Sequence, residues 1–277
     1  MKQVRMPSGE SVPALGQGTW GMGEEPRQRA QEIASLRAGL DAGLCLVDTA
    51  EMYGEGATEQ LVGEAIAGRR DEVFLVSKVY PHNASSKAMP RACAASLRRL
   101  GTDRIDLYLL HWSGAVPLAE TVEAFGRLQR AGLIRHWGVS NLDLAAMTEL
   151  WALEPGRAVQ ANQLLYNLTR RGIEWELLPW LREHSVPVMA YSPIEQGRLL
   201  AHRGLARLAA ERGRTPAQLA LAWLLAKDDV IAIPKTASRE RLAENIGALA
   251  DPLDAEAGAA LDKLFPPPPR ATPLEML

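Results

Sequence analysis

Short apolar runs alternate with longer amphipathic runs along almost the whole chain, and this alternation constrains the fold more than any other feature. The short runs predict strands at Ala14–Gly18, Cys45–Asp48, Val73–Lys78, Ile105–His111, His136–Val139, Ala158–Gln163, Val188–Tyr191 and Val230–Ile233. The longer runs predict helices at Gln28–Ala42, Glu59–Ala67, Pro90–Leu100, Leu118–Ala131, Leu144–Leu153, Glu176–His184, Arg239–Leu249 and through Pro216–Ala226. Eight strand-then-helix units in about 250 residues favour an α/β fold of the (β/α)8 TIM-barrel type over an open doubly wound sheet.

Both ends of the chain lie outside this repeat. The segment Val4–Pro13, with PSGE at its centre, predicts an N-terminal β-hairpin that could close the bottom of the barrel. Asp254–Phe265 predicts an extra C-terminal helix. Four consecutive prolines begin the tail Pro266–Leu277, so we expect it to be extended, on the surface and without regular structure. No linker or shift in composition divides the chain, which predicts a single domain over residues 1–277.

Composition excludes several classes of protein. A formal net charge of −2 argues against a bulk nucleic-acid or membrane-surface binder. The two cysteines form no pattern of pairs, and the opening residues MKQVRMPSGESVP contain no apolar segment typical of a signal peptide. No apolar run approaches the roughly 18 residues that span a membrane. We therefore expect a cytoplasmic protein, and a monomer, because no large exposed apolar helix face is evident.

One glycine pattern resembles a nucleotide-binding motif. Gly16-Gln-Gly18-Thr-Trp-Gly21 matches G-x-G-x-x-G and follows a predicted strand. The motif requires its third glycine inside a helix whose N-terminus faces a diphosphate. Here Gly23, Glu24, Glu25 and Pro26 intervene, and the two carboxylates oppose the positive potential that a diphosphate needs. We therefore expect these glycines to let the loop lie flat beside a ligand, with Trp20 as a pocket wall.

Four polar residues follow strand-like runs and form the most specific chemical set in the chain. Asp48 follows LCLV, Tyr53 comes five residues later, Lys78 follows VFLVS and His111 follows DLYLL. In a barrel the C-terminal ends of consecutive strands are neighbours, and active sites of this fold gather there. Taken singly, each residue has an ordinary interpretation as a cap, a packing residue or a solvated charge. Together they predict a common site.

This set has the composition needed to transfer a proton to or from a carbonyl oxygen. A free tyrosine has a pKa of about 10, too high for easy proton exchange near neutrality. An ammonium about 4 Å away favours the phenolate by up to about 4 kcal/mol at an effective dielectric near 20, so Lys78 predicts a lowered pKa for Tyr53. Burial and Asp48 oppose this shift. We assign Tyr53 as general acid and base, Asp48 as the partner that holds Lys78, and neutral His111 as a donor to the carbonyl oxygen.

At these residues the chain resembles the aldo-keto reductase superfamily. Asp48-Thr-Ala-Glu-Met-Tyr53 is similar to its Asp-Thr-Ala-x-x-Tyr motif, and Lys78 and His111 end strands similar to its lysine and histidine strands. Trp137-Gly-Val-Ser140-Asn141 and Ile233-Pro-Lys235-Thr236 match two further blocks. Five matches in order over nearly all 277 residues make the resemblance specific. Within the superfamily, bacterial reductases of small aldehydes and methylglyoxal are the most similar.

The resemblance implies hydride transfer from NADPH to a carbonyl carbon without a metal. It implies that Ser140, Asn141 and Gln163 hold the carboxamide, that Tyr191 stacks on the nicotinamide, and that Ser192 to Leu199 lie along the diphosphate. The cofactor-binding residues it implies are Gly18, Thr19, Trp20, Ser140, Asn141, Gln163, Tyr191, Ser192, Pro193, Leu199, Ile233, Pro234, Lys235, Thr236, Ser238, Arg241, Glu244 and Asn245.

The last part of this set also points to a phosphate on chemical grounds. Lys235 ends an apolar strand, Ser238 is placed to cap the next helix, and Arg241 lies three residues on. A helix N-terminus with two cations is a natural phosphate site, although an ordinary capped helix with surface charges has the same pattern. These cations favour NADPH over NADH, because NADH lacks the 2′-phosphate that would offset them.

The substrate pocket is expected to be open and permissive, because the tail after Phe265 is short. The residues expected around it are Trp20, Tyr53, Tyr80, His111 and Trp112. One departure from the family is Leu164-Leu-Tyr166-Asn167 in place of Glu-Tyr-His-Pro, which changes packing beneath the site. The five histidines show no metal-ligand spacing. An alternative function is an NADPH-binding regulatory or sensor module with negligible turnover.

Overall fold

The computed structural model describes residues 1–250 and 252–277, and a barrel of eight parallel strands lies at its centre. The strands are β3 (Gln17–Gly18), β4 (Leu46–Asp48), β5 (Phe74–Val79), β6 (Ile105–Leu110), β7 (Ile134–Ser140), β8 (Asn162–Leu165), β9 (Val188–Tyr191) and β10 (Val230–Ala232). Each pairs in parallel with the next one along the chain. The predicted (β/α)8 fold is confirmed.

Backbone hydrogen bonds between the first and last strands close the barrel. Gly16 N donates to Ala232 O at 2.9 Å, and Gly18 N donates to Pro234 O at 3.0 Å. A Cβ at Gly18 would lie 2.7 Å from the Ile233 carbonyl oxygen, so only glycine allows this approach. Gly16 is similarly close to Leu46. Close strand packing therefore explains the need for glycine at positions 16 and 18, and a ligand beside this loop stays a prediction.

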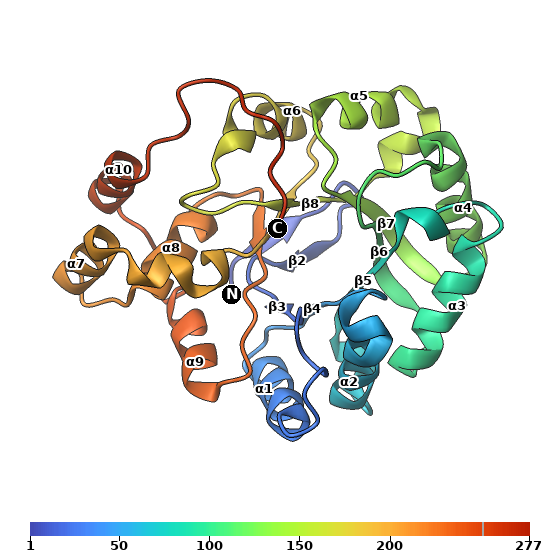
Figure 1. Cartoon of the computed structure of the whole chain (residues 1–277), viewed down its shortest axis with the longest axis horizontal. Coiled ribbons are helices and arrows are strands. Elements are labelled where there is room, and N and C mark those ends of the chain that lie inside the picture. Colours follow the sequence, from blue (N-terminus) through green and yellow to red (C-terminus); the bar gives the residue numbers. More distant parts are fainter. Residues whose placement is uncertain (251) are drawn as a thin grey trace.

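Helices surround the barrel and cover its strands (Figure 1). They are α1 (Arg29–Asp41), α2 (Ala57–Ile66), α3 (Met89–Leu100), α4 (Leu118–Arg130), α5 (Leu144–Ala152), α6 (Leu177–Glu183), α7 (Arg203–Glu211), α8 (Pro216–Leu225), α9 (Arg239–Gly247) and α10 (Ala255–Leu264). Most begin and end close to the predicted residues. The sequence pattern did not predict α7 as a helix separate from α8. Gly21 lies in the loop before α1, well outside that helix, which agrees with the rejection of a dinucleotide fingerprint.

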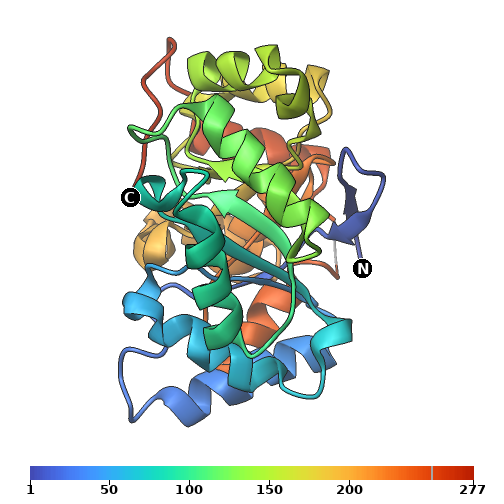
Figure 2. The same ribbon diagram turned by 90° about the vertical axis from the view of Figure 1, so that its right-hand side faces the viewer.

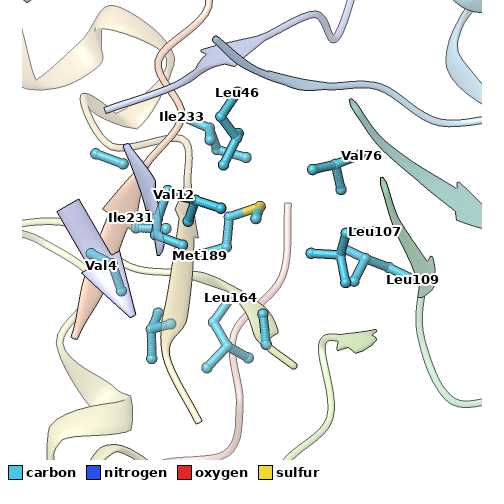
Figure 3. Packing of buried hydrophobic residues seen from close by; sticks show 14 of the residues in the cluster. Val4, Val12, Leu46, Val76, Leu107, Leu109, Leu164, Met189, Ile231 and Ile233 are labelled. Carbon is cyan, nitrogen blue, oxygen red and sulfur yellow. The ribbon is translucent and has the colours of Figure 1, made fainter. Parts of the chain in front are cut away.

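The hairpin closes one end of the barrel, as predicted. Strands β1 (Gln3–Arg5) and β2 (Ser11–Pro13) pair antiparallel, and Val4 and Val12 are buried. Their side chains lie beside Met189 and Ile231 in the core (Figure 3). Figure 2 shows the hairpin and the C-terminus on opposite sides of the barrel. The hairpin therefore seals the bottom and leaves the other end, the mouth, for chemistry.

The C-terminal tail returns to the mouth of the barrel. Residues 266–277 form no helix or strand, as predicted, and they run from α10 over the sheet to its centre (Figure 1). Near the start of the tail, the Trp175 indole N–H donates a hydrogen bond to the Pro268 carbonyl at 2.7 Å. None of the helices within residues 1–250 and 252–277 has the length and apolar character needed to cross a membrane.

Candidate active site

Strand alternation brings the polar side chains to the mouth. Side chains on one face of a strand fall at every second residue. Leu46, Val76, Leu107 and Leu109 point into the barrel core (Figure 3). Each of three polar residues lies two positions after one of these leucines or valines, on the same face of its strand. They are Asp48 after Leu46, Lys78 after Val76 and His111 after Leu109. The inward face of each strand therefore changes from apolar to polar as it reaches the mouth.

Lys78 is the centre of a compact ion-pair and hydrogen-bond cluster. Its ammonium donates to Asp48 Oδ2 at 2.8 Å, to the Thr49 carbonyl at 2.9 Å and to the Tyr53 hydroxyl at 3.0 Å. The three donor hydrogens of an ammonium are thus all used. The Lys78 side chain is completely buried, and its nitrogen also lies 4.7 Å from the centre of the Tyr53 ring. The cluster fixes the Tyr53 hydroxyl beside a buried positive charge.

Burial is the largest single influence on the pKa of both Lys78 and Tyr53, but it decides the direction of the shift only for Tyr53. Burial alone would lower the pKa of Lys78, but Asp48 and Tyr53 more than offset it, so that pKa is raised and the ammonium stays charged. Burial raises the pKa of Tyr53, and the Lys78 ammonium offsets only part of the increase. The expected lowering of the Tyr53 pKa is therefore wrong for the protein without ligand. At neutral pH the phenol is protonated and able to act as an acid.

His111 completes the set as a neutral base. Burial, together with the Lys78 charge, lowers the pKa of His111 to about 2. Its ring meets the Tyr53 ring edge-on, with centroids 5.9 Å apart. The buried Nδ1 atom has no hydrogen-bond partner within the described part of the chain. A neutral imidazole carries one N–H donor, so His111 can donate a hydrogen bond but not act as a cation.

Aromatic rings line one side of the mouth. The Trp112 ring contacts the His111 ring with centroids 4.8 Å apart and the Tyr80 ring with centroids 5.9 Å apart. Tyr53, Tyr80, His111 and Trp112 therefore come together as expected. Trp20 lies on the loop after β3 with 57% of its surface exposed, and no ring contact among the described residues joins it to the others.

The three residues expected to hold the carboxamide and Tyr191, the ring expected to stack on the nicotinamide, form a second cluster beside the first. Asn141 holds a left-handed conformation (φ 56°) that an asparagine tolerates better than most residues. Its amide oxygen accepts a hydrogen bond from the Tyr191 hydroxyl at 3.1 Å, and its nitrogen donates to Ser140 Oγ at 3.0 Å. Gln163 lies next to them, but its amide nitrogen already donates to Asp48 Oδ1 at 2.7 Å. Gln163 thus joins the two clusters.

The loop after β9 holds an unusual backbone. Ser192, Glu195 and Gln196 all have positive φ, between 48° and 54°. Each such non-glycine residue costs about 1–3 kcal/mol and persists only where its surroundings hold it. Of the residues expected to contact a diphosphate here, Pro193 and Leu199 have buried side chains, and Leu199 belongs to the hydrophobic core. Any ligand contact from Leu199 would therefore have to come from its backbone.

The last predicted group lies at the N-terminus of α9. Ser238 caps this helix by accepting from Arg241 N at 3.3 Å. Lys235 and Arg241 are exposed, and neither forms an ion pair within residues 1–250 and 252–277. Unpaired cations at a helix N-terminus fit an anion such as a phosphate. Ile233 and Pro234 are buried, and the Pro234 carbonyl is used in barrel closure. The other residues expected to bind the cofactor in this region are Thr236, which is half-buried beside Ser238, and Glu244 and Asn245 on α9, which are half-buried and buried.

Thr19, expected to bind the cofactor near β3, is buried, and its hydroxyl donates a hydrogen bond to the Asp48 carbonyl.

The structure adds residues that sequence reasoning missed. Glu51 accepts hydrogen bonds from Tyr80 N at 2.7 Å and Asn83 Nδ2 at 3.1 Å, which ties the Tyr53 loop to the Tyr80 loop. Glu195 is buried in the loop after β9 and is held by Asn167 and two arginines. The only signal for the Glu195 contacts in the sequence was Asn167, which stands where the family motif has proline. No group of three or more His, Cys, Asp or Glu that could hold a metal occurs among the described residues.

Comparisons with known proteins agree with this geometry. The Aldo/keto reductase family model matches residues 14–265. The chain is similar to methylglyoxal reductase YeaE of Escherichia coli (strain K12), with 49% identity over all of this chain and 99% of that one. It is also similar to methylglyoxal reductase DkgB of Salmonella typhimurium, with 32% identity over 91% and 94% of the two chains.

A solved structure has nearly the same fold. The crystal structure of an aldo/keto reductase from Klebsiella pneumoniae in complex with NADP and acetate superposes with a TM-score of 0.97. The two sequences are 53% identical, and the match covers all of this chain and 99% of that one. The protein whose mouth carries Asp48, Tyr53, Lys78 and His111 therefore belongs to the aldo/keto reductase family.

Proposed function

We propose that the protein is an NADPH-dependent oxidoreductase that reduces small aldehydes and dicarbonyls such as methylglyoxal to alcohols. The observation that carries the proposal is the contact of the Tyr53 hydroxyl with the buried Lys78 ammonium, which is itself held by Asp48. This arrangement keeps a neutral phenol at the mouth and places a positive charge where a phenolate would form. A binding or sensor module has no need of such a relay.

Each residue has one role in the proposed reaction. A bound NADPH would supply the hydride to the carbonyl carbon. His111 donates its N–H to the carbonyl oxygen and fixes its direction. Tyr53 gives its proton to the same oxygen as negative charge develops there, which yields the alcohol. Lys78 stabilises the phenolate left behind until a proton returns from solvent, and Asp48 keeps Lys78 charged and aimed.

The residues present fit the proposed cofactor. Asn141, Ser140 and Tyr191 offer amide and hydroxyl groups on one wall of the mouth. Lys235 and Arg241 offer exposed cations at the start of α9, which suits the additional phosphate of NADPH. The Klebsiella pneumoniae relatives were crystallised with NADP and with NADPH, which supports the same cofactor here.

The substrate class follows from the walls and from the relatives. His111, Trp112 and Tyr80 present flat apolar surface beside the proton donor. Such a surface suits a small carbonyl compound or an aromatic aldehyde. The similarity to two methylglyoxal reductases supports dicarbonyls in particular.

The proposal is tested by the rate of NADPH oxidation with methylglyoxal, an aromatic aldehyde and a simple ketone, each with both nicotinamide cofactors. We expect turnover with at least one aldehyde and a preference for NADPH. Stopped-flow measurements separate this function from the sensor alternative. Tight NADPH binding without hydride transfer to any of these carbonyls would favour the sensor and contradict the proposal.

A further inference from the structure

Glu195 is the point at which the loop after β9 is fastened to the rest of the barrel. Its side chain is only 7% exposed and accepts four hydrogen bonds. Asn167 Nδ2 donates at 2.8 Å, Arg170 Nε and Nη2 donate at 3.1 and 2.7 Å, and Arg198 Nη2 donates at 2.9 Å. Asn167 Nδ2 also donates to the Ser192 carbonyl at 2.9 Å. These contacts hold the left-handed residues of this loop in place.

Arg170 connects this loop to a distant part of the chain. Two nitrogens of its guanidinium bind Glu195, and the third, Nη1, donates to Glu275 Oε1 at 2.5 Å. Glu275 is the third residue from the C-terminus, 105 positions from Arg170 in the sequence. A planar guanidinium with five donors can bridge two carboxylates in this way, whereas a lysine ammonium cannot match its geometry. One side chain thus joins the tail to the loop after β9.

The tail itself reaches the wall of the mouth. The Leu277 backbone lies close enough to the phenol of Tyr191, the ring expected to stack on the nicotinamide, to lower the pKa of that phenol. Burial has the larger effect and raises this pKa to about 12. Most other residues of the tail are exposed. A cavity of ≈ 390 Å³ lies beneath it, lined by tail residues from Ala271 to Glu275 and by Leu144, Ile173 and Trp175. Leu274 is half-buried against the core, and Glu275 is the ion-pair anchor near the end.

We propose that Arg170 is a positioning residue through which the C-terminal tail holds the Ser192–Ala201 loop closed. When the Arg170–Glu275 pair breaks, the tail leaves the mouth and the loop loses part of its support, so NADPH departs faster. This inference rests on the proposed function, in which the same loop lies along the diphosphate. It gives the short tail a role in retaining cofactor that is separate from any contact with the carbonyl substrate.

The test is the dissociation rate of NADPH, followed by protein fluorescence in a stopped-flow instrument. Glu275→Gln removes the carboxylate charge that pairs with Arg170 and leaves every residue of the proposed site intact. A partly exposed ion pair contributes about 1 kcal/mol or less, so we expect release to become about threefold to fivefold faster. The single-turnover rate of hydride transfer should not change. Arg170→Lys should give a similar or larger increase.

A matched control separates this coupling from a general loss of stability. Asp262→Asn removes one carboxylate from the adjacent Arg171, which ties α10 rather than the tail. This variant should release NADPH at the wild-type rate. Equal acceleration in Asp262→Asn and Glu275→Gln would overturn the proposal, as would a Glu275→Gln variant that changes only the KM for the carbonyl.

Amide hydrogen exchange provides a second readout. Coupling between two sites is reciprocal, so NADPH should slow exchange at tail amides 271–277 in the wild type. The effect should be lost in Arg170→Lys. Failure of the wild type to bind NADPH would overturn the proposed function as well. Binding of NADPH without protection of the tail would overturn the coupling alone.

Discussion

The two ends of the barrel each contain a network of ionised side chains, and they differ in what those networks leave unsatisfied. At the bottom, Asp106 accepts from Arg70 at 2.7 Å and from Arg135 at 2.9 Å, and Arg135 continues to Glu10 of the hairpin. At the mouth, Lys78 holds Asp48 and Tyr53. Asp106 also accepts a hydrogen bond from the Leu75 amide, so both of its carboxylate oxygens have partners within the protein.

The mouth differs because some of its groups have no partner within the protein. Among the described residues, the Nδ1 atom of buried His111 is unpaired, and so are the exposed charges of Lys235 and Arg241. Buried polar groups without partners are costly, and they are retained where a ligand or a reaction uses them. A buried ion pair by itself therefore does not indicate a functional site, whereas polar groups without partners beside the pair do.

The largest expected contrast is between the two networks in turnover. Lys78→Met removes the charge that stabilises the Tyr53 phenolate, and we expect kcat to fall by about a thousandfold. Arg70→Met at the bottom should leave kcat within about twofold of wild type once the amount of folded protein is matched. Steady-state NADPH oxidation with methylglyoxal measures both. Similar losses in the two variants would erase the distinction between mouth and bottom.

The reverse contrast is expected in stability. Asp106→Ala leaves the partly exposed Arg70 and Arg135 without their shared carboxylate, and losing these charged hydrogen bonds should lower the free energy of unfolding by about 1.5–3 kcal/mol. Urea unfolding followed by circular dichroism should show this decrease. The kcat of the folded fraction should be unchanged. A decrease below about 1 kcal/mol would mean that the bottom network contributes little to the fold.

The pH dependence of stability should reveal the buried imidazole at the mouth. Because the pKa of His111 is about 2 in the folded protein and about 6.5 when unfolded, only the unfolded state binds a proton between these values. Stability from this group is therefore complete above pH 6.5 and falls as the pH decreases toward 2. Between pH 6.5 and pH 5 the loss is about 2 kcal/mol.

His111→Gln should remove that part of the pH dependence. Urea unfolding at pH 5 and pH 7 gives the comparison, and the variant should lose about 2 kcal/mol less than the wild type on acidification. His82→Gln, at an exposed imidazole on the loop after β5, is the control and should behave like the wild type. An identical acid response in wild type and His111→Gln would show that His111 is charged or accessible in the fold.

The smallest expected effect is on cofactor affinity, and it compares Arg241 at the mouth, which has no ion pair among the described residues, with the ion-paired Arg135 at the bottom. Arg241→Ala should weaken NADPH binding about tenfold without affecting NADH, because a charged hydrogen bond contributes about 1.5–3 kcal/mol. Arg135→Ala, which loses ion pairs at the bottom, should lower stability and leave the affinity for both cofactors unchanged. Fluorescence titration with each cofactor measures this. Unaltered selectivity in Arg241→Ala would remove that residue from the phosphate site.

Much of the mouth could be predicted because strand periodicity and position carry the information. Asp48, Lys78 and His111 each continue an inward apolar face by two residues, and barrel topology makes their strands neighbours. The direction of the Tyr53 pKa could not be predicted, since it depends on the balance between burial and one ammonium. The bridge of Arg170 to Glu195 and Glu275 also escaped prediction, because irregular segments have no periodicity that brings distant charges together.

The most direct test of the account is the single-turnover rate of hydride transfer in Tyr53→Phe, measured with saturating NADPH and methylglyoxal. Tyr108→Phe is the matched control, because it removes a phenolic hydroxyl from a fully buried tyrosine on β6 away from the cluster. We predict that Tyr53→Phe binds NADPH like the wild type but transfers hydride at least about a hundredfold more slowly, while Tyr108→Phe retains the wild-type rate. Hydride transfer near the wild-type rate in folded Tyr53→Phe would contradict the assignment of Tyr53 as the proton donor.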